Sequence, residues 1–530
     1  MTPFSKVFFA LLLIICSALL VGLWYSSHSP DYLRFPDAME YAGAARNMTE
    51  GDGFATNTLW VLRLSLSNEL PAPEIRRPLL LPFWTFLWFK ILGAKDIIAI
   101  YASAFWWFAG IILTFLFAQK YFSLKVAILS SFLLIFDKAT LNYAFGGLTE
   151  PLFTVILLAS IWSVLETKNK FRFLLGGIIL GLGQWTRTNA FLYIIPVLFI
   201  VFCNPDFKHS PSSPYKVEHN NNQSRQKKLL ISLMFILGFF ICILPIFIRN
   251  QSATGLFSLN PLYSYVVLNE TPIAPAHGME RSLSFYSPLA YFIKHPVVLI
   301  NKWSSNFIKN FECMGGSLYL IFIGLSLSGL LCLKEKKKKQ FLWFTLISIG
   351  LSIIFFSFGE FEGIRFYVPF APMLMILSIE VLFSLKNKME FGEKPVYLIS
   401  GLLISLSLIF SIQMIVKTNP DKRGLEFRQI MGRNLMTELP PDGVILSDIP
   451  WATGWYGDRT SIWLPIHPEQ IPQLEQYIKI DGILLSGSVV GSPELSSRWQ
   501  QIYTGQLALP GFEKTEGNNL SNMAFFVRKN

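Results

Sequence analysis

The chain has 530 residues, of which 52% are hydrophobic and 15% charged. Soluble domains carry about 25% charged residues, so the composition argues against an ordinary cytosolic enzyme, and the high hydrophobicity excludes an intrinsically disordered protein. The formal net charge is +11, and the length allows a large membrane body plus one further domain of roughly 100 residues.

The first long apolar run is 7–25, which approaches the roughly 20 residues that a transmembrane helix needs. It ends at Trp24 and Tyr25, side chains typical of the lipid interface. A cleaved signal peptide is the alternative, but the run is long for one and no small-x-small cleavage site follows. Further apolar runs lie at 96–119, 124–140, 149–166, 171–187, 189–203, 229–249, 316–333, 341–358, 364–385 and 396–416. The sequence therefore predicts a polytopic α-helical membrane protein with about eleven transmembrane helices.

The loops between these runs test their order, because Lys and Arg gather in cytoplasmic loops. Alternate loops are strongly basic, and the run Lys334–Lys339 is the clearest case. We therefore expect an integral membrane protein with a cytoplasmic N-terminus and an exterior C-terminal domain.

A shorter apolar stretch at 78–93 contains Pro82 and Lys90. Counting it as a span would invert every later loop and put the lysine run outside. The stretch is therefore interpreted as a re-entrant or interfacial helix.

Two modules follow from this layout: a transmembrane module over 1–416 and an exterior domain over 417–530. The first contains two exterior loops, at 26–95 and 250–315. In the second, 443–447, 482–486 and 523–527 are typical of short strands and 468–479 of a helix, which predicts a small α/β domain.

The stretch after the first span has apolar residues at helical spacing from Ala38 to Met48, which predicts an amphipathic helix along the membrane surface. Asp37 opens it and, with Glu40 three positions on, matches a capping box. Capping alone would explain Asp37. The alternative is a general base that takes a proton from an acceptor hydroxyl, for which Asp31 is a weaker competitor because it lacks the helix start.

A second acid, Glu150, begins a predicted outer-facing helix, with Thr149 as N-cap and Pro151 in the first turn. Favourable placement at the positive end of a helix explains it, yet an acid this near the membrane is also a functional candidate.

Four arginines at outer ends of spans complete the set of candidates. Each by itself is explained by snorkelling, but if they converge they suit an anion, because guanidinium groups bind phosphate bidentately. They are Arg77, Arg187, Arg249 and Arg365.

The scattered cysteines and histidines show no CxxC, HExxH or HxxxH spacing. We expect no protein-built metal site and no required cofactor, although an ion bound by carboxylates stays open. A Walker loop and a GxGxxG motif are also absent from the sequence.

Taken together, these motifs resemble the membrane-embedded GT-C glycosyltransferases, and within them the bacterial branch of the protein mannosyltransferase and aminoarabinose transferase group. The run from Asp37 through Tyr41 to Phe54 resembles their first exterior loop, and Arg77-Pro78 their basic-Pro motif. The segments that follow in the expected order are those around Glu150, Arg187, Arg249 and Arg365, and then Trp451–Pro465 in the exterior domain.

This resemblance implies an inverting transferase that moves a sugar from a polyprenyl phosphate to an acceptor hydroxyl on a lipid, glycan or protein at the outer face. It makes Asp37 the base and lets Tyr41 and Glu150 position donor or acceptor. It assigns the leaving phosphate to Arg77 and Arg249, with Arg187 and Arg365. Eukaryotic relatives carry an acidic pair at the start of this loop, whereas Ala38 follows Asp37 here, which weakens the case for a protein acceptor.

Two other classes of function remain open on the sequence. A polysaccharide polymerase or ligase would place its key residues in a late exterior loop such as 250–315. A transporter or flippase should show discontinuous helices and polar groups near the midplane, and the charges within these spans are few and lie near their ends.

Overall fold

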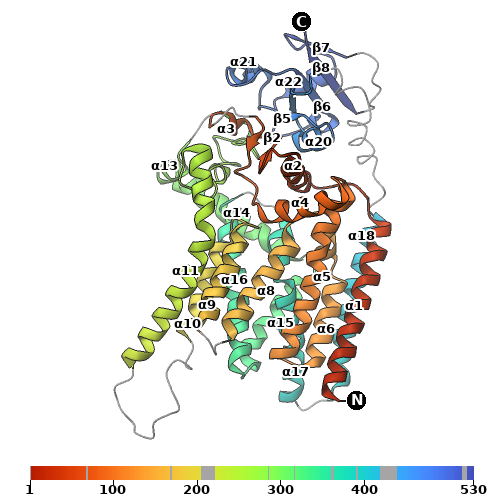
Figure 1. The fold of residues 1–530 in the computed structure, drawn as a ribbon, viewed down its shortest axis with the longest axis vertical. Coiled ribbons are helices and arrows are strands. Elements are labelled where there is room, and N and C mark those ends of the chain that lie inside the picture. Colours follow the sequence, from red (N-terminus) through yellow and green to blue (C-terminus); the bar gives the residue numbers. More distant parts are fainter. Residues whose placement is uncertain are drawn as a thin grey trace.

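The computed structural model describes residues 2–66, 70–166, 170–203, 221–283, 286–315, 317–359, 363–389, 392–417, 439–515 and 522–529. A helical body occupies one end of the molecule, and a small α/β domain caps the other (Figure 1).

Every predicted span coincides with helix. The helices are α1 (Pro3–His28), α5 (Asp96–Tyr121), α6 (Leu124–Ile135) with α7 (Lys138–Ala144), α8 (Glu150–Leu165), α9 (Phe171–Gln184), η1 (Ala190–Tyr193) with α10 (Ile194–Phe202), α11 (Asn221–Thr254), α15 (Tyr319–Cys332), α16 (Lys336–Phe356), η3 (Gly363–Phe366) and η4 (Val368–Phe370) with α17 (Ala371–Met389), and α18 (Lys394–Lys417). Within the described ranges six helices are long and apolar enough to cross a membrane, and a pair bent by 98° is a seventh candidate. The polytopic helical class is confirmed, while the shorter helices leave the count of eleven a prediction.

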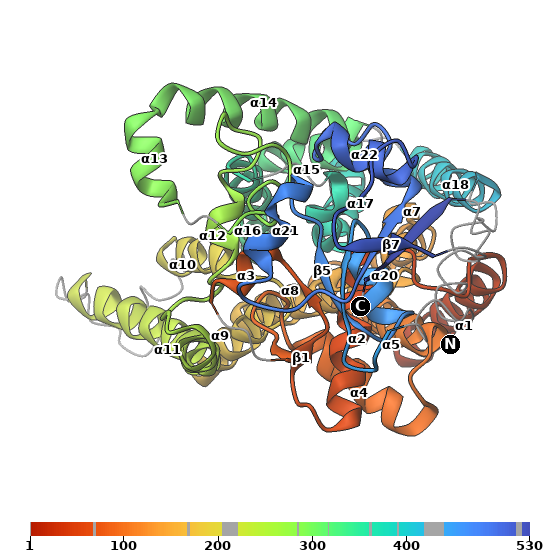
Figure 2. The ribbon, with the colours of Figure 1, turned by 90° about the horizontal axis from the view of Figure 1, so that it is seen from above.

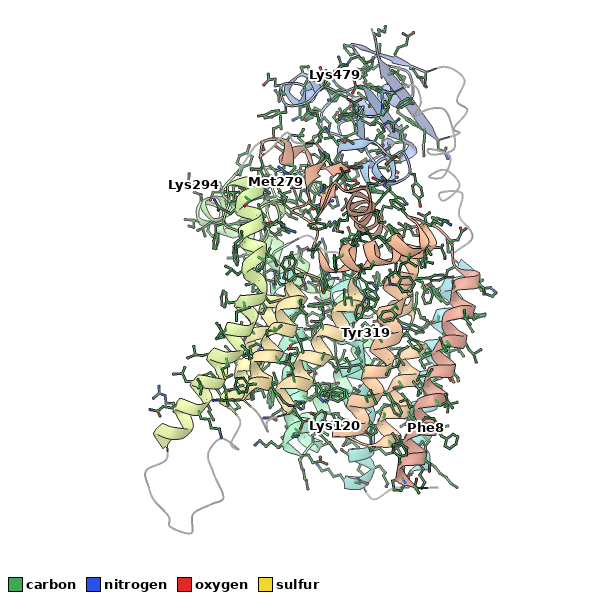
Figure 3. All side chains as sticks on the ribbon, viewed as in Figure 1. Phe8, Lys120, Met279, Lys294, Tyr319 and Lys479 are labelled. Carbon is green, nitrogen blue, oxygen red and sulfur yellow. The ribbon has the colours of Figure 1, made fainter. Side chains whose placement is uncertain are left out.

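The predicted inner loops meet at one end of the helical body. Lys125 pairs with Glu393 at 2.7 Å, and Lys338 with Glu380 at 2.9 Å. In Figure 3, Lys120 and Phe8 lie at this end, far from Lys479 in the α/β domain. The basic loops and the domain therefore occupy opposite ends of the molecule.

At the domain end, the stretch 78–93 forms α4 (Leu80–Leu92), whose 13 residues extend only about 20 Å. It lies across the end of the helical body, below α2 (Pro36–Glu50) (Figure 1). One prediction for α2 is wrong. The helix is capped at Phe35 with no side-chain hydrogen bond, so Asp37 lies in the first turn and makes no capping box.

Helix α2 is also buried more fully than an amphipathic surface helix. Met39, Glu40 and Tyr41 are all at most 4% exposed, because α4 packs on one side and α20 (Pro450–Trp455) of the α/β domain packs on another. The helix ends at Gly51, which takes a left-handed φ of 105° that glycine adopts without strain.

The second exterior loop is more helical than the sequence suggested. It contains α12 (Tyr263–Val266), α13 (Pro288–Lys294) and α14 (Pro296–Gly315), and Figure 2 shows α13 and α14 along the rim of the molecule. In α14 several apolar side chains are exposed while three polar ones are buried: Ile300 is 62% exposed, whereas Lys302, Asn306 and Asn310 are at most 8% exposed. Such an inverted pattern suits contact with lipid.

The α/β domain is built on a six-stranded sheet in the order β2-β5-β4-β6-β8-β7. Its strands are β4 (Val444–Ser447), β5 (Thr460–Trp463), β6 (Gly482–Ser486), β7 (Phe512–Lys514) and β8 (Met523–Arg528), with β2 (Thr58–Leu59) from the first exterior loop. The three predicted strands are confirmed, whereas β5, β7 and the helices α20 and α22 (Ser497–Tyr503) were not foreseen. The predicted helix at 468–479 shrinks to η6 (Pro468–Gln470) and α21 (Ile471–Leu474).

The two modules are joined through the first exterior loop. Strand β2 pairs parallel with β5, Thr58 opposite Ser461, and it is followed by α3 (Val61–Leu64). Nearby, β1 (Ala55–Thr56) pairs with β3 (Ala72–Pro73). Arg46 of α2 donates to the carbonyls of Gly454 and Trp455 at 2.8 and 2.9 Å. The domain therefore rests directly on the loop that carries Asp37.

Candidate active site

Asp37 lies at the centre of an ion-pair network. Its Oδ1 pairs with Arg77, and its Oδ2 lies 2.5 Å from Nη1 of Arg365. Arg77 comes from the segment before α4 and Arg365 from η3, so two loops far apart in the sequence meet at the first turn of α2. The predicted base and two of the four predicted arginines are thus brought together.

Glu150 extends the network into the helical body. Its Oε1 accepts from Arg187 at 2.5 Å and also pairs with Arg365. Glu150 is the first residue of α8, as predicted, although Thr149 makes no side-chain cap. Arg365 therefore bridges Asp37 and Glu150, and it links the exterior loop to the transmembrane body.

Tyr41 and Arg249 occupy different positions. Tyr41, one turn after Asp37, places its ring 5.6 Å from the Arg77 guanidinium. Arg249 does not join the network: it donates to Oδ1 of Asn250 at 2.9 and 3.1 Å, and its guanidinium lies 5.2 Å from the Phe54 ring. Arg249 thus lines neither of the two large cavities. It is also the one predicted arginine that does not pair with Asp37 or Glu150.

Three further charged residues, Glu40, Glu74 and Arg76, belong to the network but were not assigned to the site from the sequence. Glu40 pairs with both Arg76 and Arg77 and is only 3% exposed. Glu74 accepts from the backbone N–H groups of Arg76 and Arg77 at 2.7 and 2.8 Å, which holds both arginines in place. The one signal in the sequence was that Arg76 and Arg77 are adjacent. The basic-Pro motif uses only Arg77, which left Arg76 without an assigned role.

Burial and charge set the protonation of the two groups on α2. Burial by itself raises the pKa of Asp37, but the guanidinium groups of Arg77 and Arg365 outweigh it and hold that pKa below its ordinary value. Burial, with the charge of Asp37, raises the pKa of the Tyr41 phenol. Asp37 is therefore ionised and Tyr41 neutral at physiological pH.

A cavity of about 360 Å³ opens beside the network on the side of the helical body. Asp37, Arg77, Arg187 and Arg365 line its polar end. Its other wall is aromatic and includes Phe191, Phe355, Phe356, Phe358 and Phe366. Such a cavity joins cationic groups to an apolar surface at the end of α16.

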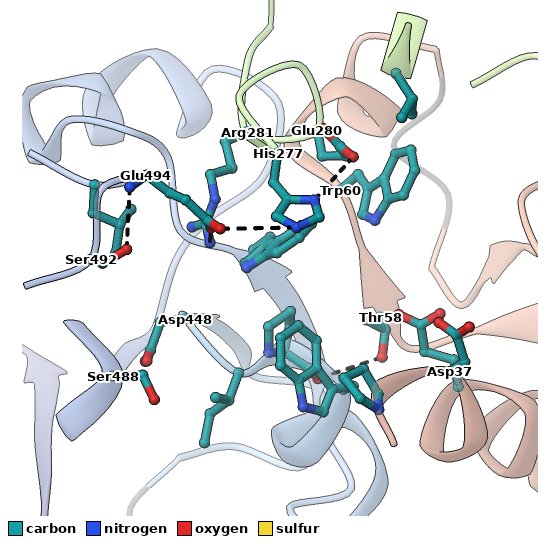
Figure 4. A pocket seen from close by; sticks show the side chains of 18 of the residues that line it. Asp37, Thr58, Trp60, His277, Glu280, Arg281, Asp448, Ser488, Ser492 and Glu494 are labelled. Carbon is teal, nitrogen blue, oxygen red and sulfur yellow. Dashed lines mark hydrogen bonds and ion pairs between the residues drawn. The ribbon is translucent and has the colours of Figure 1, made fainter. Parts of the chain in front are cut away.

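A second cavity, of about 560 Å³, lies between the first exterior loop and the α/β domain. Figure 4 shows Asp37 on one side of it and Asp448 and Ser488 on the other. Asp37, Arg76 and Arg77 line both cavities. The carboxylate of Asp37 thus lies between two cavities. The one beside the α/β domain is polar and aromatic, and the one beside the helical body is cationic and apolar.

Nothing in the described part of the chain gathers three His, Cys, Asp or Glu side chains in a way that could hold a metal ion. Asp37, Glu40 and Glu150 are each paired with arginine, and Glu74 accepts from the backbone of Arg76 and Arg77. That the reaction requires no divalent ion stays a prediction.

Residues 76–217 match the family model of dolichyl-phosphate-mannose-protein mannosyltransferase. No curated protein matches the chain in sequence.

Solved structures match the fold over nearly the whole chain. ArnT from Cupriavidus metallidurans bound to undecaprenyl phosphate aligns with a TM-score of 0.58 at 11% identity and covers 97% of each chain. The Archaeoglobus fulgidus oligosaccharyltransferase in complex with Zn and sulfate aligns with a TM-score of 0.59 at 12% identity, over 98% of this chain and 73% of that one.

The fold is therefore that of the GT-C membrane glycosyltransferases. The chain shares this fold with ArnT, and its residues 76–217 are similar to the protein mannosyltransferase family, in agreement with the resemblance of its motifs.

Proposed function

We propose that this protein is an inverting glycosyltransferase that moves a sugar from a polyprenyl-phosphate donor to an acceptor hydroxyl. The observation that carries the proposal is the position of Asp37, which lines two different cavities and pairs with two arginines. One cavity suits a lipid phosphate and the other an acceptor, so donor and acceptor can meet at one carboxylate.

The donor fits the cavity on the side of the helical body. Its phosphate would lie among Arg77, Arg187 and Arg365, and its polyprenyl chain would leave along the phenylalanines. Phe355 and Phe358 are 39% and 38% exposed at the outer surface, which opens this wall toward lipid. The ArnT structure that shares the fold holds undecaprenyl phosphate, a ligand of the same chemistry.

The reaction needs one proton acceptor and one stabilised leaving group. The acceptor oxygen attacks the anomeric carbon while its proton passes to Asp37, and the bond from that carbon to the phosphate oxygen breaks. The electron pair stays with the polyprenyl phosphate, whose growing charge Arg77 and Arg365 neutralise from fixed positions. A single displacement of this kind inverts the anomeric carbon.

Donor binding also changes the base. In the structure Arg77 and Arg365 contact Asp37 and hold its pKa low, and a carboxylate held in this way is a weak base. A donor phosphate competes for the same guanidinium groups, which raises the pKa of Asp37 when the substrate is in place.

We place the protein in the bacterial plasma membrane, with the N-terminus in the cytoplasm and the α/β domain outside. Support comes from the basic loops, which lie at the end of the helical body opposite the domain. The site would then lie at the outer face of the membrane.

The test separates transfer from transport. Purified protein in vesicles is given a labelled polyprenyl-phosphate sugar and a cell-envelope extract as acceptor. Label moving covalently to the acceptor supports the proposal, whereas movement of intact donor across the bilayer without transfer indicates a flippase. Transfer that survives changes at Asp37 but is lost on changes in 250–315 indicates a polymerase or ligase.

A further inference from the structure

The cavity between the first exterior loop and the α/β domain lies at a characteristic place in its sheet. Strands β2, β5, β4 and β6 are parallel. The cavity is lined by residues at or just after their carboxyl ends, namely Trp60, Trp463, Asp448 and Ser488. In open α/β sheets, ligands bind in the crevice outside the carboxyl ends of the strands. We call this cavity the sheet crevice.

The walls of the sheet crevice are aromatic. Trp463 lies at the centre, with its ring 5.8 Å from Trp451 and 4.3 Å from the Arg281 guanidinium. Trp60 faces the crevice from the first exterior loop (Figure 4). The indole N–H groups of Trp60 and Trp463 are buried and find no hydrogen-bond acceptor among the described residues. Each is a donor without a protein partner beside an open cavity.

Carboxylates outnumber guanidinium groups in the lining of the crevice, and Arg76 and Arg77 there already pair with Glu40 and Asp37. Glu494, Glu280 and Asp448 line it (Figure 4). Arg281 lies 3.2 Å from Glu494 and donates to the carbonyl of Leu464 at 3.0 Å, so its charge is already compensated. Burial raises the pKa of Asp448, which accepts from the backbone of Ser486 at 2.8 Å. A group that donates several hydrogen bonds therefore suits the crevice better than a second anion.

Together these features select one class of ligand. We propose that the sheet crevice binds a neutral saccharide unit of the acceptor, a role that rests on the proposed function. Sugar C–H groups can lie against the negative faces of the tryptophan rings, while hydroxyls donate to the carboxylates and accept from the indole N–H groups. An acyl chain would leave these polar groups unpaired, and a phosphate would face three carboxylates.

The size and position of the crevice agree with this role. Its volume of about 560 Å³ lies within the roughly 300–1,000 Å³ of small-molecule sites. Asp37 is among the residues that line it, so a saccharide held against Trp451 and Trp463 can present a hydroxyl to the base.

The experiment measures saccharide binding apart from catalysis. Full-length protein in lipid nanodiscs is applied to an array of neutral bacterial envelope oligosaccharides, with acidic peptides and anionic lipid vesicles as other probes. We expect saccharide binding by the wild type. Trp451→Ala and Glu494→Gln should each weaken binding at least tenfold.

Two controls keep the result decisive. Trp451 is only partly buried, so its loss should leave the domain folded. Glu469→Gln is the matched control for Glu494→Gln, because it breaks an arginine pair, with Arg498, on the same domain but outside the crevice. It should bind as the wild type does, and thermal melting of each variant confirms folding.

Binding of the wild type to peptides or vesicles but to no saccharide would overturn the proposal, as would equal losses of binding in Glu494→Gln and Glu469→Gln. An Asp37→Asn variant that still transfers sugar would instead refute the proposed function. The two failures are distinguished because one is read from affinity and the other from turnover.

Discussion

Replacing Asp37 with Asn tests the proposed chemistry most directly, because it removes one carboxylate charge and keeps the size of the side chain. We expect kcat/KM for sugar transfer to fall about 10²–10⁴-fold, the usual contribution of a general base. At about 1.36 kcal/mol per factor of ten, this equals about 2.7–5.4 kcal/mol of lost transition-state stabilisation.

The structure also predicts that the variant folds. Arg77 keeps Glu40 as a partner and Arg365 keeps Glu150, so neither guanidinium is left alone. Each lost charge-assisted hydrogen bond contributes about 1.5–3 kcal/mol, but the cost of burying the charge of Asp37 disappears with them. We therefore expect the free energy of unfolding to fall by no more than about 3–5 kcal/mol, the loss that is typical of removing one partner of a buried ion pair.

The assay follows labelled sugar from a polyprenyl phosphate to acceptor in vesicles, with thermal melting measured in parallel. Asp31→Asn is the matched control, because Asp31 is exposed in the same loop and lines neither cavity. Wild-type rates of transfer by Asp37→Asn, in a correctly folded protein, would refute the assignment of the base. Equal losses in Asp31→Asn and Asp37→Asn would show that the effect is not specific to the network.

Other predictions follow from the same contacts. Arg365→Lys should raise KM for the donor about tenfold, since a lysine cannot contact Asp37 and Glu150 as a guanidinium does; an unchanged KM contradicts this. Because the pKa of Asp37 is held low, kcat/KM should show no acid limb above about pH 4, and the stability from its ion pairs should be present above that pH and lost only as pH falls further. Gly454→Ala should cost about 1–3 kcal/mol of domain stability, because an added Cβ would lie 2.7 Å from Oγ1 of Thr58; an unaltered melting curve argues against this close contact. Chelation with EDTA should leave transfer unchanged, and loss restored by a divalent ion would show a metal requirement.

Most of the helical body was predictable, because a membrane-spanning helix is recognised from a local run of hydrophobic residues. The elements that the sequence did not predict lack such a run. Helix α14 escaped notice because its apolar residues are spread along one face rather than gathered in a run. Strand β2 has two residues, too few for any pattern, and it exists because β5 offers it an edge.

The candidate site was likewise predicted in part. Asp37, Glu150 and three of the four arginines were identified from their places at outer ends of helices, and the structure brings them into one network. Arg249 had the same local signal but lies outside it. Arg76 and Glu40 were not assigned to the site, because their neighbours in the chain indicate only a pair of adjacent arginines and a capping box.

What the sequence by itself determined was the class of protein, the order of its spans and the identity of the carboxylate at the start of α2, since hydrophobic length and charge act over a few neighbouring residues. Only the tertiary structure decided which arginine reaches which acid and where the cavities open. It also placed the α/β domain on the first exterior loop. These contacts join residues that lie from about forty to more than three hundred positions apart in the chain, and packing in three dimensions rather than local composition selects them.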